Sequence, residues 1–304
     1  MKYLVTFLVA LFPSLAFLCA EESCCKDINL QDKQVPYYGR IYYDNVLPAT
    51  IKKKDIDHKK LRYQVAGVNA GSVFLYNPNC NEGLAATLGY DWTYLCWKGN
   101  PSFDQCNFQY LNLSLSGFSK RVKNWTWKAN ATMKIDPTNF NWSHYLCWDL
   151  LMWGRYAYSA DIFLHVGFYA ITGMNINRIY PVLGVEWTCT TPWRPLKLSL
   201  VFPFDISALW KINDYWEAGV AARFFQSRHR VDKNEPLPRG LWLYTAYGGE
   251  LTMNYHYSDF IHANLHAGGV FGGELKIADR HWDNPRHFET GLAPYFGAEI
   301  SLSY

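Results

Sequence analysis

The sequence has few charges and, beyond its first twenty residues, no long apolar run. Charged residues make up 18% of the 304-residue chain, and 29 basic residues stand against 26 acidic ones. This near balance excludes a chain built to bind nucleic acid or another polyanion. A membrane-spanning helix needs about 20 predominantly apolar residues in a row, so a helical membrane protein is excluded as well. A membrane β-barrel is not excluded, because its strands hide their apolar residues by alternation.

Aromatic residues are abundant, at 17% of the chain with 13 Trp and 22 Tyr. Disordered chains contain few aromatics, so this composition predicts a folded protein. Many of the rings lie near the ends of expected strands, which is typical of the interfacial girdles of membrane barrels. The rings in question are Tyr90, Trp92, Tyr94, Trp125, Trp127, Trp153, Tyr156, Tyr158, Trp210, Trp216, Tyr255 and Tyr257. A soluble all-β core is the alternative explanation.

The amino terminus reads as a secretory signal. Lys2 precedes an apolar stretch over 4–18, and the small residues Cys19 and Ala20 precede two glutamates. This pattern predicts a signal peptide over 1–20, a short periplasmic segment over 21–35 and a barrel over 36–304. Cleavage would remove one of the eight cysteines and leave an odd number, which indicates a thiol available to another protein. Cys24 or Cys25 is then a candidate disulfide partner for a second envelope protein.

The carboxyl end has the clearest period-two pattern. Phe296, Leu302 and Tyr304 share one apolar face, whereas glycine, glutamate and serine occupy the other. Such alternation predicts a strand, and its terminal aromatic resembles the assembly signal of bacterial outer-membrane barrels. We therefore expect these three side chains to face lipid and to be recognised by the barrel assembly machinery. A secreted sandwich could also end on such a strand.

Turns and long polar loops alternate along the chain. Tight turns are expected at Asn213-Asp214 and Ser258-Asp259, and long loops over 228–239 and 278–287. Short periplasmic turns and longer outer loops are typical of outer-membrane barrels. The sequence thus predicts an all-β fold, a transmembrane antiparallel up-and-down β-barrel of about fourteen strands, with twelve as the alternative. The expected strands are 36–44, 61–76, 83–95, 107–118, 124–135, 143–158, 160–171, 181–189, 195–203, 205–212, 214–227, 241–257, 259–277 and 289–304.

Several stretches in the last 125 or so residues are similar to those of a known protein family. These are PVLGVEW at 181–187, LKLSLVFP at 196–203, NDYWEAG at 213–219, YGGEL at 247–251, GGVFGGELKI at 268–277 and APYFGAEISL at 293–302. They resemble an uncharacterised family of bacterial outer-membrane β-barrel proteins, a domain of unknown function. The resemblance implies a place in the outer membrane and implies no activity for any residue.

The polar face of the expected strands predicts the lining of the lumen. Both charge signs occur there in similar number, which favours cross-lumen ion pairs over strong ion selectivity. The densest cluster of titratable and amide groups is predicted on two neighbouring strands, with three further charges on the same face. The candidate lumen residues are Glu250, Asn254, His256, His262, Asn264 and His266, together with Arg155, Arg223 and Glu217.

Hydrolysis and metal binding are the two other chemistries that such residues could support. A hydrolase would need a nucleophile bonded to one of the histidines, and no serine lies at a convincing position beside them. His262 and His266 are too far apart on one strand to share a metal ion. Cys96 and Cys106 bracket an expected outer loop and are candidates for a disulfide, with reduced thiols as the alternative.

The sequence-based hypothesis is a narrow, weakly selective passive pore or a structural envelope protein in contact with outer-membrane lipid. It assigns no catalytic residue, no cofactor and no metal. An outer-membrane enzyme acting on lipid or peptide and a surface adhesin are the alternatives.

Overall fold

A computed structural model describes residues 37–52, 59–79, 81–139, 142–189, 195–203, 205–257 and 260–303. The predicted signal peptide, the segment carrying Cys24 and Cys25, the Ser258-Asp259 turn and Tyr304 lie outside these residues. No helix among the described residues is long and apolar enough to cross a bilayer.

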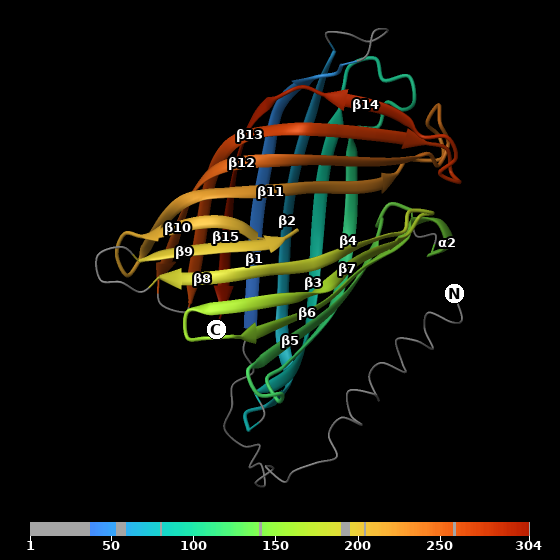
Figure 1. Cartoon of the computed structure of the whole chain (residues 1–304). Coiled ribbons are helices and arrows are strands. Elements are labelled where there is room, and N and C mark those ends of the chain that lie inside the picture. Colours follow the sequence, from blue (N-terminus) through green and yellow to red (C-terminus); the bar gives the residue numbers. More distant parts are fainter. Residues whose placement is uncertain are drawn as a thin grey trace. The chain divides into compact units, whose positions relative to one another are not determined.

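The described chain folds into one sheet that closes on itself as an antiparallel barrel (Figure 1). Its strands are β1 (Tyr37–Thr50), β2 (Lys60–Asn77), β3 (Glu82–Cys96), β4 (Asn107–Ser119), β5 (Trp125–Ile135), β6 (Leu146–Ala157), β7 (Ile162–Gly173), β8 (Arg178–Cys189), β9 (Leu196–Phe202), β10 (Asp205–Lys211), β11 (Trp216–Arg230), β12 (Leu241–Tyr257), β13 (Ile261–Ala278), β14 (Arg286–Thr290) and β15 (Ala293–Ser303). A single helical turn, α2 (Trp142–Tyr145), precedes β6.

Closure runs through the last strand, because β15 pairs with both β1 and β13. The short strand β14 pairs with the other half of β13, so β14 and β15 are two halves of one strand interrupted at residues 291–292. The prediction of a fourteen-stranded antiparallel barrel is confirmed, with the expected strand over 289–304 divided in two.

The three ten-residue connections lie at one end of the barrel, together with the short β7–β8 and β9–β10 connections at 174–177 and 203–204. The β3–β4, β5–β6 and β11–β12 connections span ten residues each, at 97–106, 136–145 and 231–240. We call this the loop end. The β10–β11 connection at 212–215 lies at the opposite end, with the first residue of β1 and the last of β15. We call that the turn end. The alternation of turns and long loops expected from the sequence is therefore present.

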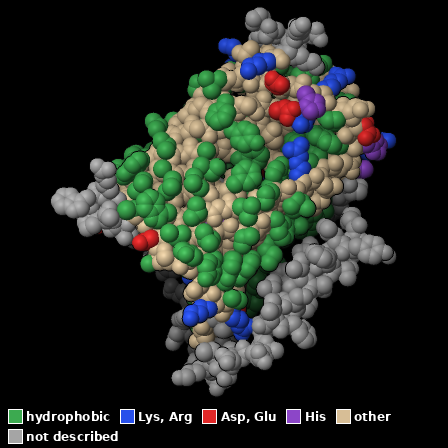
Figure 2. Space-filling view, in the orientation of Figure 1, with side chains coloured by type: hydrophobic (Ala, Val, Ile, Leu, Met, Phe, Trp, Pro, Cys, Tyr) green, Lys and Arg blue, Asp and Glu red, His purple; other side chains and the backbone are tan. Residues whose placement is uncertain are grey.

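Apolar side chains cover the outside of the wall. Leu251, Leu265 and Val220 are 70%, 54% and 50% exposed although they lie in the middle of long strands. Figure 2 shows such side chains over the visible wall, with most of the charges near its ends. A contiguous apolar surface of this extent is typical of a surface that contacts lipid.

Aromatic rings flank this surface at the turn end. Trp125 stacks on Trp127 at 5.0 Å between ring centres and makes a tilted contact with Tyr156 at 5.1 Å. Trp153 was expected in the same girdle, but it faces the lumen, where its indole N–H donates to Nδ1 of His165 at 2.9 Å. The reason is parity, since residues two apart on a strand share a face and Trp153 shares the lumen face with Arg155.

The interior of the barrel at the loop end is filled rather than hollow. Buried apolar side chains from β1–β4, β11–β15 and three loops form one core there: Val46, Ala49, Ile51, Leu61, Tyr63, Leu95, Trp97, Phe103, Phe108, Phe225, Val231, Trp242, Tyr244, Ala246, Val270, Leu275, Ile277, Phe288, Ala293 and Tyr295. Close packing of this kind leaves little room for water.

The end of the β11–β12 hairpin lies inside this core. Trp242 packs on Phe108 of β4 at 5.0 Å between rings, whereas Leu243, one residue further on, packs against Ile171 of β7. Successive residues of a strand point to opposite faces, so both faces of the hairpin are covered, one by each wall of the barrel. We call residues 228–243 the inner hairpin.

The inner hairpin corrects the expected loop over 228–239. Strand β11 continues to Arg230, and Arg228, His229 and Arg230 are buried at 6%, 4% and 4% exposure. Their charge and polarity suggested a solvated loop, but carbonyls and a carboxylate inside the barrel satisfy the two arginines, and the Thr93 hydroxyl lies 3.2 Å from Nε2 of His229. A bulge in the β12–β13 ladder between Thr245 and Tyr247, beside Gly272 with a φ of 60°, accompanies the turn of these strands into the lumen.

Candidate functional site: the polar lumen cavity

Below the inner hairpin the lumen holds two adjoining cavities of about 690 Å³ and about 520 Å³. The larger one extends from Tyr38 and Ser303 at the turn end to Asp149 beneath the hairpin. Residues shared by both linings are Arg40, Lys134, Asp149, Tyr169 and Glu299. The lumen therefore has a polar half on the turn side and an apolar, filled half on the loop side.

An ion-pair network centred on Arg223 forms one wall of the smaller cavity. Its guanidinium donates to both carboxylate oxygens of Glu250, at 3.0 and 3.2 Å. The hydroxyl of Tyr295 also donates to Glu250. Asp44 completes the group, 3.7 Å from Arg223 and 2.7 Å from Nε2 of His266. Bidentate Arg–carboxylate pairs hold both partners in one geometry.

A second network connects the opposite wall to the inner hairpin. Asp149 lies 2.8 Å from the Lys134 ammonium and 3.0 Å from the Arg228 guanidinium. Arg228 also donates to the backbone carbonyls of Trp148, Thr172 and Ile176 at 3.0–3.2 Å. Because these carbonyls belong to β6, β7 and the β7–β8 turn, one side chain ties the hairpin to three parts of the wall.

The remaining predicted lumen residues fall into two groups nearer the turn end. Glu217 lies 3.5 Å from Nε2 of His256, whose Nδ1 is 2.7 Å from Nδ1 of His262. Arg155 pairs separately with Glu186 at 3.0 Å on β8. The sequence-based cluster is thus three groups rather than one.

Asn254 and Asn264, two of the predicted lumen residues, connect the Arg223 network to neighbouring polar side chains. The Asn264 amide donates to Thr252 and to Asn254, each at 2.6 Å, and its oxygen lies 2.7 Å from Nδ1 of His266. All of these groups face the lumen on β12 and β13. They form a rigid polar wall whose members satisfy one another.

The histidines of this predicted cluster bond to carboxylates, to an amide, to Arg223 and to each other. His256 and His262 bond to each other and to a carboxylate, and neither bonds to a hydroxyl among the described residues. No group of three or more His, Cys, Asp or Glu that could hold a metal ion occurs within the described ranges. Each charged group above has a partner of opposite sign, as the mixed composition led us to expect.

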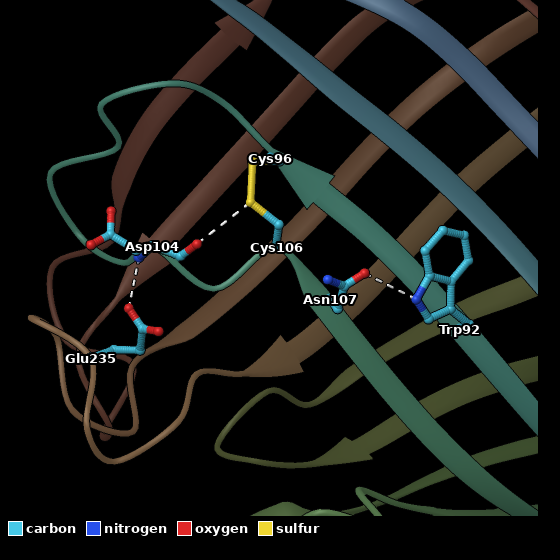
Figure 3. The surroundings of a disulfide bond; sticks show 6 residues. All are labelled: Trp92, Cys96, Asp104, Cys106, Asn107 and Glu235. Carbon is cyan, nitrogen blue, oxygen red and sulfur yellow. Dashed lines mark hydrogen bonds between the residues drawn. A yellow bond between two sulfur atoms is a disulfide. The ribbon is translucent and has the colours of Figure 1, made fainter.

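A disulfide closes the loop between β3 and β4 (Figure 3). Cys96 and Cys106 are bonded, with their Cα atoms 4.8 Å apart. The backbone N–H of Asp104, inside this loop, donates to Glu235 of the β11–β12 loop at 2.7 Å. The disulfide-bonded loop is therefore hydrogen-bonded to the β11–β12 loop at the tip of the inner hairpin.

The closing strand presents Phe296 and Leu302 on the outside, at 45% and 50% exposure. Three lumen residues that sequence reasoning did not single out are Asp44, Tyr295 and Arg228. Asp44 lies on the polar face of the expected strand over 36–44, which was a usable signal. Tyr295 occupied the small or polar face of the final strand, and Arg228 lay in an expected loop, so neither carried one.

Comparisons with known proteins place the chain among relatives of unassigned function. An uncharacterised protein of Chlamydia pneumoniae is 23% identical over 304 residues, covering 93% of this chain and 91% of that protein. An uncharacterised protein of Chlamydia trachomatis serovar D is 22% identical over 269 residues, covering 83% of each. No family model matches the chain.

Among solved structures, an outer membrane channel from Pseudomonas putida F1 has a TM-score of 0.47 at 10% identity, covering 92% of this chain and 100% of that one. The TodX monoaromatic hydrocarbon channel has a TM-score of 0.43 at 6% identity, covering 90% of each chain. At these scores the likenesses assign no function. The expected likeness to an uncharacterised family is confirmed by the chlamydial relatives: the chain is a closed β-barrel similar along almost its whole length to uncharacterised proteins of Chlamydia.

Proposed function

We propose that this protein is an outer-membrane barrel that acts as a narrow pore and that the inner hairpin holds the pore closed in the conformation described. The observation that carries the proposal is the division of the lumen. A polar cavity of about 690 Å³ lies on the turn side, and an apolar core containing Trp242 and Tyr244 fills the loop side.

The outer surface supports the membrane placement. Closed barrels leave no unpaired sheet edge around most of their circumference, which suits a solvent that cannot form hydrogen bonds. The apolar exterior, the aromatic rings at the turn end and the alternation of turn lengths agree with an outer-membrane barrel. With the turn end in the periplasm, the inner hairpin closes the lumen on the extracellular side. Membrane lipid is then the main partner of the outer wall.

The polar half of the lumen supports a conducting role over a purely structural one. A barrel of fourteen strands is wide enough to enclose water, whereas eight strands are filled by side chains. Here the filling on the loop side comes from a hairpin attached at one end, and not from the wall alone. Displacement of that hairpin would join the cavity to the outside.

Planar-bilayer recording tests this proposal. We expect small, infrequent conductance steps for the native chain and reversal potentials near zero in a salt gradient, because neither charge sign dominates the lining. A Trp242→Ala, Tyr244→Ala double variant should loosen the core and give larger or more frequent steps. Ala267→Ser, on the exposed face of β13, is the matched control.

Two results would contradict the proposal. Large steps with strong anion or cation preference in the native protein would show that the lumen is open and selective. Silence in the native protein, in the double variant and after cleavage of the 231–240 loop would show a structural or adhesive barrel.

We further propose that the closing strand, with Phe296, Leu302 and Tyr304, is the segment that the barrel assembly machinery recognises, and that Cys24 or Cys25 forms a disulfide with another envelope protein. The exposed positions of Phe296 and Leu302 support the first of these.

A further inference from the structure

Two neighbouring strands are too short to cross a membrane. β9 and β10 have seven residues each, whereas β8 has twelve and β11 fifteen. A transmembrane β-strand needs about 9–11 residues. In Figure 1, β8 and β11 extend past the arrows of β9 and β10 toward the loop end. The β9–β10 turn therefore lies at a depth where the other strands are still crossing.

The strand ladders show where the wall is interrupted. The β8–β9 ladder ends at the pair Leu183–Phe202, and the β10–β11 ladder ends at Ile206–Ala222. Residues 178–182 of β8 and 223–230 of β11 lie beyond these last pairs. We call the space between these two edges, above the β9–β10 turn, the wall gap. Irregular or unpaired backbone at membrane depth is tolerated where it lines a water-filled cavity or is buried in protein.

The smaller cavity reaches the free edge of β11. Arg223 and Ala221 face the lumen, whereas Ala222 and Phe224 belong to the opposite, outward face of the same strand. All four line the cavity of about 520 Å³, and so does Pro203 between β9 and β10. The cavity therefore adjoins the wall gap, which would serve as a side opening of the polar lumen.

Aromatic groups form the rim of this opening. The Phe224 ring packs edge-on against Tyr180 of β8 at 6.2 Å and lies 5.4 Å from Tyr247 of β12. Beside the cavity, the Gln226 amide donates to the Tyr180 hydroxyl across the gap at 3.0 Å. Further along β11, Arg228 donates to the carbonyl of Ile176, just before β8, at 3.2 Å. A single neutral hydrogen bond contributes only about 1 kcal/mol, so the closure beside the cavity is weak.

A carboxylate lies at the base of the opening. Asp205, the first residue of β10, is exposed and lines the cavity. It accepts a hydrogen bond from Ser207 at 2.7 Å, and no cation lies within ion-pair distance of it among the described residues. The cavity as a whole has three cationic side chains against four carboxylates, and its cations Arg40, Lys134 and Arg223 are bonded to carboxylates other than Asp205. At the far end of the gap, Arg178 faces the Tyr180 hydroxyl at 3.4 Å and does not line the cavity.

We propose that the wall gap between β8 and β11 is a lateral binding site through which a small amphipathic amine enters the lumen from the membrane. Its aromatic or aliphatic body would lie against Phe224 and Tyr180, and its ammonium group would pair with Asp205. Aromatic faces attract cations as well as apolar groups, which suits both parts of such a ligand. The inference rests on the proposed membrane placement and is independent of whether the inner hairpin opens.

Binding to the whole protein in lipid vesicles tests the site. Tritiated 2-phenylethylamine would be measured by co-sedimentation, with protein-free vesicles subtracted, and with neutral 2-phenylethanol and anionic 3-phenylpropanoate as competitors. We expect saturable binding of the amine, with the alcohol and the acid competing at least about tenfold less well, as expected for loss of one charge-assisted hydrogen bond.

Two variants and two controls locate the binding. Asp205→Asn should lower the affinity for the amine about tenfold and abolish the preference over the alcohol. Ala222→Trp should obstruct the opening and remove binding. Asp161→Asn, in a turn-end connection, and Ala267→Trp, on the exposed face of β13, should bind the amine like the native chain. Folding of each variant is checked by heat-modifiable migration in gels.

The proposal is overturned if Asp205→Asn keeps the preference for the amine, if folded Ala222→Trp binds as well as the native chain, or if the acid binds more tightly than the amine. Asp205 is exposed, so its variant also tests the site if Ala222→Trp does not fold. Bilayer conductance is measured separately, so failure here leaves the proposed pore standing, and failure of the pore leaves the binding result interpretable.

Discussion

The guanidinium of Arg228 lies 3.0 Å from the carboxylate of Asp149, across the interior of the barrel, although 79 positions separate them in the chain. Only 7% of the Arg228 side chain and 16% of the Asp149 side chain are exposed. This pair joins the inner hairpin to the wall formed by β6.

Replacing Arg228 with methionine should release the inner hairpin from that wall. The change leaves a buried carboxylate with Lys134 and the Tyr169 hydroxyl as its remaining partners, and we expect a loss of about 3 kcal/mol of unfolding free energy. Urea titration in vesicles, followed by tryptophan fluorescence, measures it. Lys211→Met removes a rim ion pair with Asp214, whose side chain is 90% exposed, and should cost much less, because exposed ion pairs contribute little to stability. Equal losses in the two variants would show that Arg228 does not hold the hairpin.

Arginine at Leu251 or Leu265 should destabilise the barrel by about 2–4 kcal/mol if these positions lie near the bilayer midplane. Both side chains are on the outside, so the introduced charge would enter lipid. Ser116 lines the larger cavity, and Ser116→Arg places the same charge in the lumen, where the cost should be small. Folding yield and urea titration in vesicles compare the three. A silent Leu265→Arg with a damaging Ser116→Arg would invert the assignment of the two faces.

Removing the Cys96–Cys106 disulfide should loosen the β3–β4 loop. A bond closing a loop of about 10 residues contributes about 2–3 kcal/mol by constraining the unfolded chain. The Cys96→Ser, Cys106→Ser double variant should lose about that much and become sensitive to protease between 97 and 106. Cys189→Ser, at a half-buried cysteine outside this loop, is the control. Alkylation and mass spectrometry of the native protein should find the Cys96 and Cys106 thiols unreactive until reduction.

Asp232, in the β11–β12 loop, should titrate at an unusually low pH. The backbone N–H of Asn234 donates to the Asp232 carboxylate at 2.9 Å, and the Asn139 amide donates to it at 3.3 Å. These hydrogen bonds lower the pKa of Asp232 below its ordinary value. Because the folded-state pKa is the lower one, the carboxylate stabilises the loop above the unfolded pKa, and that stabilisation is lost as pH falls through the folded pKa. An NMR titration of the Asn234 amide proton in micelles measures the midpoint. Asn139→Ala should raise it, and a midpoint at or above about 3.9, the ordinary aspartate value, would contradict the prediction.

Tyr304→Asp should prevent assembly. If the closing strand is the signal for the assembly machinery, a charge on its last aromatic position should abolish heat-modifiable, membrane-embedded protein. Ser303→Asp, on the alternate face of the same strand, is the control. Folded Tyr304→Asp barrel at native yield in the envelope would remove the assignment of Tyr304, Leu302 and Phe296 as the signal.

Much of the barrel could be predicted from the sequence because membrane strands alternate strictly. The period-two pattern decided which residues share a face, so Leu251 and Leu265 were assigned to the outside and Arg223 and Glu250 to the inside. Turn chemistry and loop lengths decided the strand number and the two ends. These are local properties of the chain, so they can be predicted without knowing which residues meet across the barrel.

The filling of the lumen was decided only by the tertiary structure. Arg228, His229 and Arg230 look like loop residues in the sequence, because most of the carbonyls, the carboxylate and the Thr93 hydroxyl that satisfy them lie far away in the chain. The partition of the predicted polar cluster into separate groups, and the recruitment of Asp44 and Tyr295 to Glu250, likewise depend on which strands face one another after closure. The wall gap needs both levels: the sequence contains two short strands, but only their pairing shows that β8 and β11 extend past them. Alternation determines which face a side chain occupies, whereas closure of the barrel determines what it meets there.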